Sequence, residues 1–337
     1  MSTTPNFSRV CIYGAGAIGG WIGTLLAETG CSVSVVARGA TLDALQTHGL
    51  RLQTKDGSRS MPVKASANPA DLGEQDLVVV AVKAPAMLDV ARQIGPLLGP
   101  NSVVLTAMNG VPWWFLQGFG GDYAGHTLKS VDATGDITRA IPAQHVIGCV
   151  VHASCALNGP GYVQHNFGQK LIIGEPSGQA TPRVQALAAL LQRAGFEVPV
   201  AENIQQDTWF KLWGNMTVNP ISAMTGATTD LIMNDDLVRG FVSAVMLEAK
   251  AVGAKLGIVI DQAPEDRHAV TRKLGAFKTS MLQDVEAGRS VELDALVNAV
   301  RELGAITGVA TPYTDALFGL ARVHAQVHGL YPKPSAQ

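Results

Sequence analysis

A lysine and two asparagines recur at four-residue spacing in an otherwise apolar segment. Lys211, Asn215 and Asn219 stand at positions i, i+4 and i+8 of residues 208–220, among mainly aromatic and aliphatic neighbours. On a helix this spacing places the three side chains along one face. A lysine there can donate a proton to a ketone oxygen as negative charge develops, because burial lowers a lysine pKa. The two amides can hold a carboxylate or a hydroxyl. The alternative is a hydrated or internally hydrogen-bonded polar stripe.

A glycine-rich loop near the N-terminus has the spacing G-x-G-x-x-G. The loop follows a short apolar run at residues 10–13 and precedes a predicted helix at residues 21–27. This context is typical of a dinucleotide-binding fingerprint, in which the glycines allow a tight turn, close approach of a pyrophosphate and close helix packing. The helix N-terminus then faces the phosphates. A purely structural glycine turn is the alternative. The predicted cofactor-binding residues of this loop are Gly14, Ala15, Gly16, Ala17, Ile18 and Gly19.

The residue after the next predicted strand indicates which dinucleotide is bound. Residues 31–37 form that strand, and Arg38 follows it where an NAD enzyme carries Asp or Glu for the ribose 2′-hydroxyl. A cation suits a 2′-phosphate, whereas a carboxylate would repel it. We therefore predict NADPH rather than NADH, with a solvated surface arginine as the alternative.

Two polar residues follow later buried strands. Lys83 comes after residues 76–82, and Asn109 comes after residues 102–107. Ligands of open α/β sheets gather at the carboxyl ends of the strands. Lys83 is therefore expected beside the cofactor, and the Asn109 amide near the nicotinamide ribose or the substrate. A simple turn at Asn109-Gly110 is the alternative.

The remaining pattern predicts two domains. The expected fold is α/β, with an N-terminal Rossmann-type doubly wound domain at 7–203 and an all-α C-terminal domain at 204–330. Asp56-Gly57 indicates a hairpin within residues 51–65. Further expected strands are residues 146–156, 161–166 and 170–174, and further expected helical runs are residues 181–194, 237–256, 268–287, 293–307 and 313–327.

Composition excludes several classes of protein. The 337 residues are 47% hydrophobic and 15% charged with a net charge of −2, which argues against a nucleic-acid partner. No apolar run reaches the ~18 residues of a membrane span, and the N-terminus lacks a signal-peptide layout. The four cysteines form no C-x-x-C pair, which favours a reduced, cytoplasmic protein. His324 and His328 lack a nearby third ligand, so no metal is expected.

A further polar cluster lies towards the C-terminus. Ser280 and Asp284 are four residues apart on one predicted helix, and Glu292 opens the next. Spacing alone favours surface and capping roles for these residues.

Together these stretches resemble the ketopantoate reductase family, the 2-dehydropantoate 2-reductases, over nearly the whole chain. The most specific motifs are Lys211-Leu-x-x-Asn215-x-x-x-Asn219-Pro220 and Ser280-Met-Leu-Gln-Asp284. The resemblance implies NADPH-dependent reduction of a 2-keto acid, by default 2-dehydropantoate in pantothenate biosynthesis, with Lys211 as the proton donor. Implied substrate-binding residues are Asn109, Asn215, Asn219 and Ser280. Implied cofactor contacts outside the glycine loop are Arg38, Lys83, Asn109 and Glu292, to which we add Ala153.

The chain also departs from the family pattern. Phe277 and Thr229 replace two asparagines on the substrate side, and bulky aromatic residues at 113–115 follow Asn109-Gly110. A phenylalanine cannot hydrogen-bond a substrate hydroxyl, and losing such a partner can change discrimination greatly. The reaction class is expected to survive, whereas the 2-keto acid could differ from 2-dehydropantoate.

Two other functions fit parts of the pattern. A 3-hydroxy acid dehydrogenase also pairs a Rossmann domain with a helical domain and uses Lys and Asn, with the lysine as base. A non-catalytic NADPH-sensing regulator needs the glycine loop and Arg38 but not Lys211. The resemblance also implies a homodimer formed through the helical domain.

Overall fold

The structure is a computed structural model that describes residues 6–333, and its contacts divide it into two compact units. Unit 1 contains the described residues up to Met108 and Thr134–Asp207, and unit 2 contains Asn109–Ala133 and the described residues from Thr208. The predicted domains 7–203 and 204–330 are continuous, whereas unit 2 also takes in the segment after Met108. The reason is packing, because Val111, Phe115, Leu116 and Leu128 of this segment are buried in the helical core.

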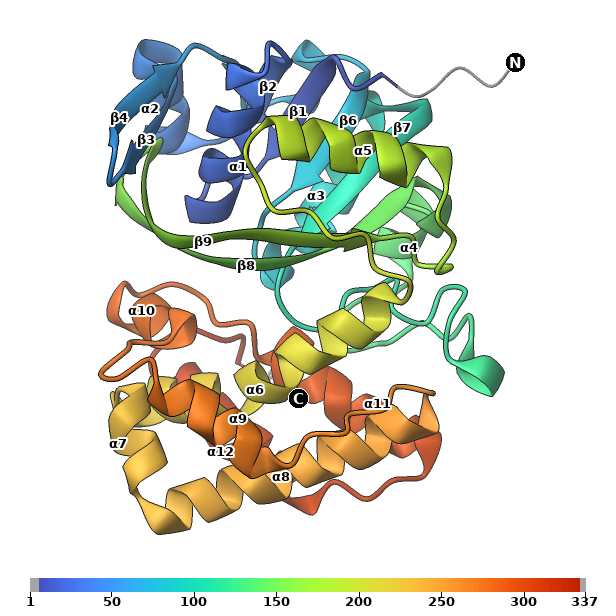
Figure 1. The fold of residues 1–337 in the computed structure, drawn as a ribbon, viewed down its shortest axis with the longest axis vertical. Coiled ribbons are helices and arrows are strands. Elements are labelled where there is room, and N and C mark those ends of the chain that lie inside the picture. The colour runs from blue at the N-terminus through green and yellow to red at the C-terminus, as the bar shows by residue number, and fades with distance from the viewer. Residues whose placement is uncertain (1–5, 334–337) are drawn as a thin grey trace. The chain divides into compact units, whose positions relative to one another are not determined.

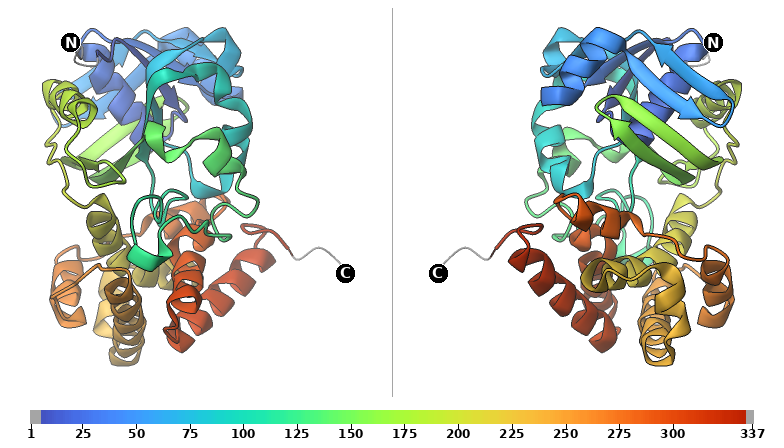
Figure 2. Two further views of the ribbon diagram at one scale, coloured as in Figure 1. Left: turned by 90° about the vertical axis from the view of Figure 1, so that its right-hand side faces the viewer. Right: turned by 90° about the vertical axis from the view of Figure 1, so that its left-hand side faces the viewer.

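Unit 1 is built on a sheet with the strand order β4-β3-β9-β8-β7-β6-β1-β2-β5. The strands from β8 through to β5 run parallel, while β9 is antiparallel to β8, and β4 to β3. Figure 2 shows β3 and β4, in blue, beside the green strands β8 and β9. The strands are β1 Arg9–Tyr13, β2 Ser32–Val36, β3 Leu50–Thr54, β4 Gly57–Met61, β5 Lys64–Ser66, β6 Gln75–Val80, β7 Leu98–Ala107, β8 Val146–Gly159 and β9 Tyr162–Gly174.

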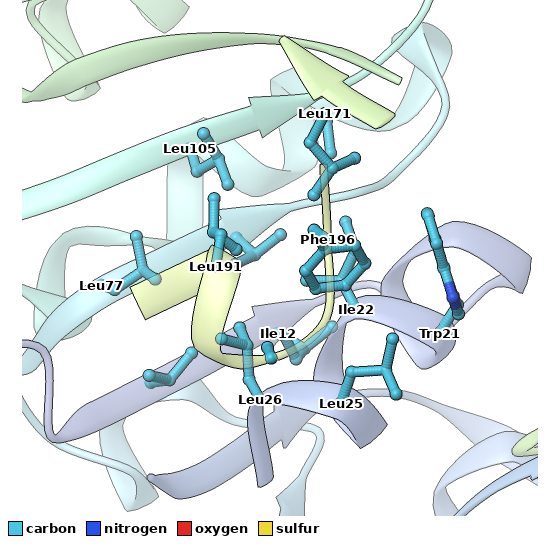
Figure 3. Packing of buried hydrophobic residues seen from close by; sticks show 14 of the residues in the cluster. Ile12, Trp21, Ile22, Leu25, Leu26, Leu77, Leu105, Leu171, Leu191 and Phe196 are labelled. Atoms are coloured by element: carbon cyan, nitrogen blue, oxygen red, sulfur yellow. The ribbon is translucent and has the colours of Figure 1, made fainter. Parts of the chain in front are cut away.

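Helices pack on this sheet through apolar side chains. The helices of unit 1 are α1 Ala17–Glu28, α2 Gly39–His48, α3 Met87–Gln93, α4 Asp136–Ala140 and α5 Pro182–Arg193. In Figure 1, α1 and α5 lie in front of the strands, and Figure 3 shows their side chains meeting those of the sheet. Ile12 of β1 and Leu77 of β6 pack in one cluster with Ile22 of α1 and Leu191 of α5, all fully buried. The N-terminal Rossmann-type fold expected from the sequence is confirmed.

One expected strand does not exist separately. Residues 170–174 were expected as a third strand after 161–166, but β9 runs without a break over Tyr162–Gly174. The polar interruption in the sequence is a bulge, because the pairing with β8 shifts register between His152 and Ser154. Gly168 lies opposite this shift with φ +82°, a left-handed conformation that suits glycine.

Unit 2 is helical, as expected, and its helices are coloured yellow to red in Figure 1. They are α6 Ile204–Thr225, α7 Thr229–Asn234, α8 Asp236–Lys255, α9 Pro264–Arg272, α10 Ser280–Glu286, a π-helical turn at Asp294–Asn298, α11 Ala299–Thr307 and α12 Pro312–Val327. The single helical run expected at 268–287 is wrong. Gly275 has φ +63°, and Thr279 caps the next helix by accepting a hydrogen bond from the Leu282 amide, so α9 and α10 are separate.

Within the described residues, no helix is long and apolar enough to cross a membrane. The same residues contain no cluster of three or more His, Cys, Asp and Glu side chains that could hold a metal ion.

Candidate active site

The glycine loop of unit 1 joins β1 to α1 and can be tested for its fit to a pyrophosphate. Gly14 has φ +97°, and a Cβ there would lie 2.6 Å from Val82 Cγ1. A Cβ on Gly19 would lie 2.1 Å from the Gly14 carbonyl oxygen, so glycine is required for helix and loop to pack. By contrast, a Cβ on Gly16 would meet no described atom within 4 Å. The side of the loop at Gly16 is therefore open to a ligand, and this fits a dinucleotide phosphate.

The N-terminus of α1 is suited to an anion. Gly16 is the N-cap residue, and among the described residues no side chain caps the helix and no acidic residue lies in its first turn. The first amide groups of a helix have no intrahelical acceptor and carry the positive end of its dipole. The segment Ala17–Gly19 therefore presents donors that a phosphate oxygen can accept.

The structure places the other predicted cofactor residues of unit 1 as follows. Arg38 follows β2, is exposed and forms the N-cap of α2. Lys83 follows β6 and is half-buried at the start of a 3₁₀ turn. Ala153 is half-buried in β8, next to the register shift. Arg38 and Lys83 thus follow parallel strands at their carboxyl ends.

In unit 2 the lysine of the sequence motif is held by an asparagine. Lys211 is half-buried on α6, and its Nζ donates a hydrogen bond to Asn109 Oδ1 at 2.8 Å. Asn109 directly follows β7 and the adjoining Met108 in the chain, 102 residues before the lysine. The carbonyl oxygen of Asn109 therefore orients the ammonium group, and two residues that the sequence linked only through the resemblance are in direct contact.

The two asparagines on α6 have unused hydrogen-bonding capacity. Asn219 is 8% exposed and Asn215 is half-buried, yet neither amide is hydrogen-bonded to another described residue. A buried amide without a partner costs free energy, so such amides are usually satisfied by water or a ligand. Pro220 lies inside α6 and has no N–H to donate, which is an irregularity directly beside Asn219.

A π-helical turn supports the Asn109 segment. Gly110 has φ +83°, and a Cβ there would lie 2.7 Å from Ala295. The amide of Val111 donates to the Ala295 carbonyl at 2.8 Å. Ala295 belongs to the π turn Asp294–Asn298, and Glu292, just before it, is 8% exposed. Asn109-Gly110 therefore forms the expected turn, and the Asn109 side chain also accepts the hydrogen bond from Lys211.

The two positions that depart from the family pattern contact each other. Thr229 Oγ1 donates to the Gly275 carbonyl at 2.7 Å and accepts from the Phe277 amide at 3.3 Å, while the Thr229 amide donates to the Phe277 carbonyl. Thr229 is 2% exposed, so its hydroxyl is committed to the loop before α10. Ser280, the first residue of α10, is exposed, and its hydroxyl has no partner among the described residues.

The aromatic residues after Asn109-Gly110 are core residues. Trp113 and Trp114 are each 2% exposed and Phe115 is fully buried. Such side chains leave almost no surface for a ligand. Phe277, which also departs from the family pattern, is only half-buried and is therefore more exposed than these three aromatic residues.

An arginine that the sequence analysis missed lies against α6. The guanidinium of Arg267, on α9, stacks 5.6 Å from the centre of the Phe210 ring. A Cβ on Gly214 would lie 2.6 Å from its Nε. Burial lowers the pKa of this arginine. Arg267 stands 53 positions after Gly214 in the chain, so no spacing pattern could have linked the two residues.

A dinucleotide-binding domain and a helix with a positioned lysine are together typical of oxidoreductases that use a nicotinamide dinucleotide. Unit 1 has the fold and the open glycine loop of a dinucleotide-binding domain, and unit 2 carries a positioned lysine with two unpaired amides on one helix.

Comparison with known proteins narrows this class to one family. The family model "Ketopantoate reductase PanE/ApbA" matches residues 10–178, and "Ketopantoate reductase PanE/ApbA C terminal" matches residues 203–325. The chain is 45% identical to 2-dehydropantoate 2-reductase of Mesorhizobium japonicum, over 96% of this chain and 99% of that protein.

Solved structures agree with this assignment. A protein from Ralstonia solanacearum MolK2, provisionally assigned as a ketopantoate reductase, is 54% identical with a TM-score of 0.92, covering 97% of this chain and 100% of that chain. The 2-dehydropantoate 2-reductase of Geobacter metallireducens GS-15 is 28% identical with a TM-score of 0.81, covering 93% and 98%. The chain belongs to the ketopantoate reductase family. It is an oxidoreductase of a family of NADPH-dependent 2-keto acid reductases.

Proposed function

We propose that this protein reduces 2-dehydropantoate to pantoate with NADPH, and that Lys211 is the proton donor. The observation that carries the proposal is the hydrogen bond of 2.8 Å between Lys211 Nζ and Asn109 Oδ1, beside the unpaired amides of Asn215 and Asn219. A protonated amine held in a fixed position next to free amide donors suits a ketone oxygen that gains negative charge.

The proposed reaction has two transfers. When bound, NADPH would supply a hydride to C2 of the keto acid, with the electron pair of the C=O bond moving to oxygen. Lys211 Nζ gives its proton to that oxygen, which becomes the hydroxyl of the product. Asn109 keeps the amine in place, while Asn215, Asn219 and Ser280 hold the polar groups of the substrate.

The proposed cofactor residues are those of the glycine loop together with Arg38, Lys83, Asn109, Ala153 and Glu292. The loop would take the pyrophosphate on its open side, and Arg38 would pair with the 2′-phosphate. The proposal for Arg38 is supported by its exposed position at the carboxyl end of β2.

The first test is loss of NADPH absorbance with purified protein and a panel of 2-keto acids that includes 2-dehydropantoate. Turnover of 2-dehydropantoate with kcat/KM of ~10⁴ M⁻¹s⁻¹ or more is expected. Turnover of another 2-keto acid alone would retain the reaction class and reject the substrate. That outcome would point to a pocket altered by Phe277 and by the commitment of Thr229 to the loop.

The role of Lys211 is tested by Lys211→Met. We expect kcat to fall by about 10²-fold or more, since a general acid contributes at least that much, while the Kd for NADPH stays unchanged. The control is Lys255→Met at the exposed end of α8, which should leave both constants as in the wild type. Turnover of Lys211→Met at the wild-type rate would reject the assignment.

Two alternatives are separated by the same assay. A 3-hydroxy acid dehydrogenase would oxidise 3-hydroxy acids with NADP⁺ and leave 2-keto acids unreduced, with Lys211 as base. An NADPH-sensing regulator would bind NADPH and consume none with any acid. The positioned Lys211 and the unpaired amides favour an enzyme over a regulator.

We also propose that the protein is a cytoplasmic homodimer. Four unpaired cysteine thiols support a reducing compartment.

The proposed dimer is supported by exposed apolar side chains on one side of α12. They are Leu320, Val323 and Val327, which are 65%, 58% and 74% exposed. Such a surface favours burial against a second copy. Sedimentation at micromolar concentration should give a dimer, and Leu320→Asp should shift it towards the monomer. A wild-type monomer would reject this proposal.

A further inference from the structure

Arg267 is a cation without an anion in the helical unit. Its Nε is fully buried and unpaired, and none of its guanidinium nitrogens has a hydrogen bond or ion pair with any described residue. Three other arginines of the unit have polar partners: Arg289 pairs with Asp284 and Arg301 with Asp315, while Arg239 donates to the Met233 carbonyl. The Phe210 ring and the backbone at Gly214 both lie against the guanidinium of Arg267.

This guanidinium packs against the side of α6 that carries Phe210 and Gly214. Gly214, which it touches, directly precedes Asn215 and follows Lys211 by three residues. At 100° per residue, Gly214 is turned by about 60° around the helix axis from Lys211. Gly214 has no side chain, and a Cβ there would lie 2.6 Å from Nε and 2.8 Å from Nη2. The glycine therefore lets the charged group approach the helix about 60° around its axis from the lysine, on the side away from Asn215.

An unpaired, partly desolvated charge costs free energy that packing alone does not return. Burial lowers the pKa of Arg267, which is the expected sign of this cost. A guanidinium presents its donors in a planar fork that matches a carboxylate, and such pairs are among the stronger polar contacts. A 2-keto acid brings a carboxylate directly bonded to the ketone carbon.

We propose that Arg267 binds the carboxylate of the 2-keto acid substrate and thereby sets the preference for acids over uncharged ketones. This inference rests on the proposed function, because it requires that the ketone of the same substrate is protonated by Lys211. Arg267 thus acts on substrate binding, and its charge is neutralised when the complex forms.

The test compares a charged substrate with an uncharged one. We would measure kcat/KM of the wild type and Arg267→Gln for the 2-keto acid that the enzyme reduces best and for its methyl ester. Removing one partner of a desolvated charge pair costs at least about 30-fold, so Arg267→Gln should lose that factor or more with the acid and little with the ester. The loss should appear mainly in KM, since the charge pair is present before the chemical step.

Matched variants separate binding from packing. Lys273→Gln removes an exposed cation at the end of the same helix and should keep the wild-type ratio of acid to ester. Gly214→Ala keeps the arginine but forces its guanidinium away from α6, so it should lower the ratio as Arg267→Gln does. Arg267→Gln should melt at or above the wild-type temperature, because it removes an uncompensated charge.

The outcomes also distinguish this inference from the proposed function. If the wild type reduces no 2-keto acid, the proposed function fails. If it does and Arg267→Gln keeps the wild-type ratio of acid to ester, the role of Arg267 is rejected. Equal losses with acid and ester, together with a lower melting temperature, would show a packing role and would also reject it.

Discussion

The charge at the end of β2 should decide which dinucleotide unit 1 accepts. Arg38 is exposed and no acidic residue lies in the first turn of α2, which it caps. A charged hydrogen bond contributes about 1.5–3 kcal/mol, so Arg38→Ala should raise the KM for NADPH about 10- to 100-fold. The KM for NADH should change little, because NADH has no 2′-phosphate.

Lys55→Ala serves as the control for this measurement, since Lys55 is an exposed cation in the turn between β3 and β4. Steady-state kinetics with both dinucleotides would measure the effect. Equal increases in KM for NADPH and NADH would contradict a 2′-phosphate contact.

Residue spacing predicted the polar face of α6 but not its neighbours. Lys211, Asn215 and Asn219 share one helix, so their face follows from the period of 3.6 residues. Asn109 lies 102 residues from Lys211, and only the fold brings the two side chains into contact. Arg267 was missed for the same physical reason, because its partners Phe210 and Gly214 belong to another helix.

At the scale of elements, two glycines of the β1–α1 loop should respond differently to the same substitution. Gly19→Ala would place a Cβ 2.1 Å from the Gly14 carbonyl oxygen, so strand and helix must separate. Overpacking of this kind costs about 1–3 kcal/mol of unfolding free energy. Gly16→Ala meets no described atom within 4 Å, so the protein should keep its stability and lose NADPH affinity.

Denaturant unfolding and calorimetric titration with NADPH would measure both effects. Gly16→Ala is the matched control for stability, since it adds the same methyl group in the same loop. Tight NADPH binding by Gly16→Ala would show that the open side of the loop does not face the pyrophosphate.

The spacing of apolar residues predicted most helices and strands. It failed where the backbone conformation does not follow the apolar pattern. The polar break at residues 166–169 suggested the end of a strand, whereas Gly168 forms a bulge and β9 continues. The periodic run at 268–287 suggested one helix, whereas Gly275 and the Thr279 cap divide it. In both cases a glycine with positive φ decides the backbone path, which apolar spacing does not report.

At the scale of the whole molecule, the two compact units are not two continuous stretches of the chain. The sequence changes from mixed α/β to helical near residue 203, yet residues 109–133 pack with the helical unit. A segment between two strands has no helical period of its own that would reveal this. Its membership follows from tertiary burial of Val111, Phe115 and Leu128 in that core.

The stability of the protein should fall in mild acid because of one buried histidine. His268 on α9 is 2% exposed, and its Nε2 has no partner among the described residues. Burial lowers its pKa below 6.5, and the nearby Arg272 and Arg239 act in the same direction while Glu265 opposes them. Below pH 6.5 the unfolded chain therefore takes up a proton that the folded chain does not.

The unfolding free energy should thus decrease by up to about 1.4 kcal/mol per pH unit from this group, from near pH 6.5 down to the folded pKa. Urea unfolding of the wild type and His268→Leu between pH 8 and pH 5 measures the difference, since all other titrating groups are shared. The two proteins should differ in the slope of stability against pH and not only in stability at pH 8. Parallel pH profiles would mean that His268 has the same pKa in the folded protein as in the unfolded chain, and would contradict a lowering of that pKa by burial.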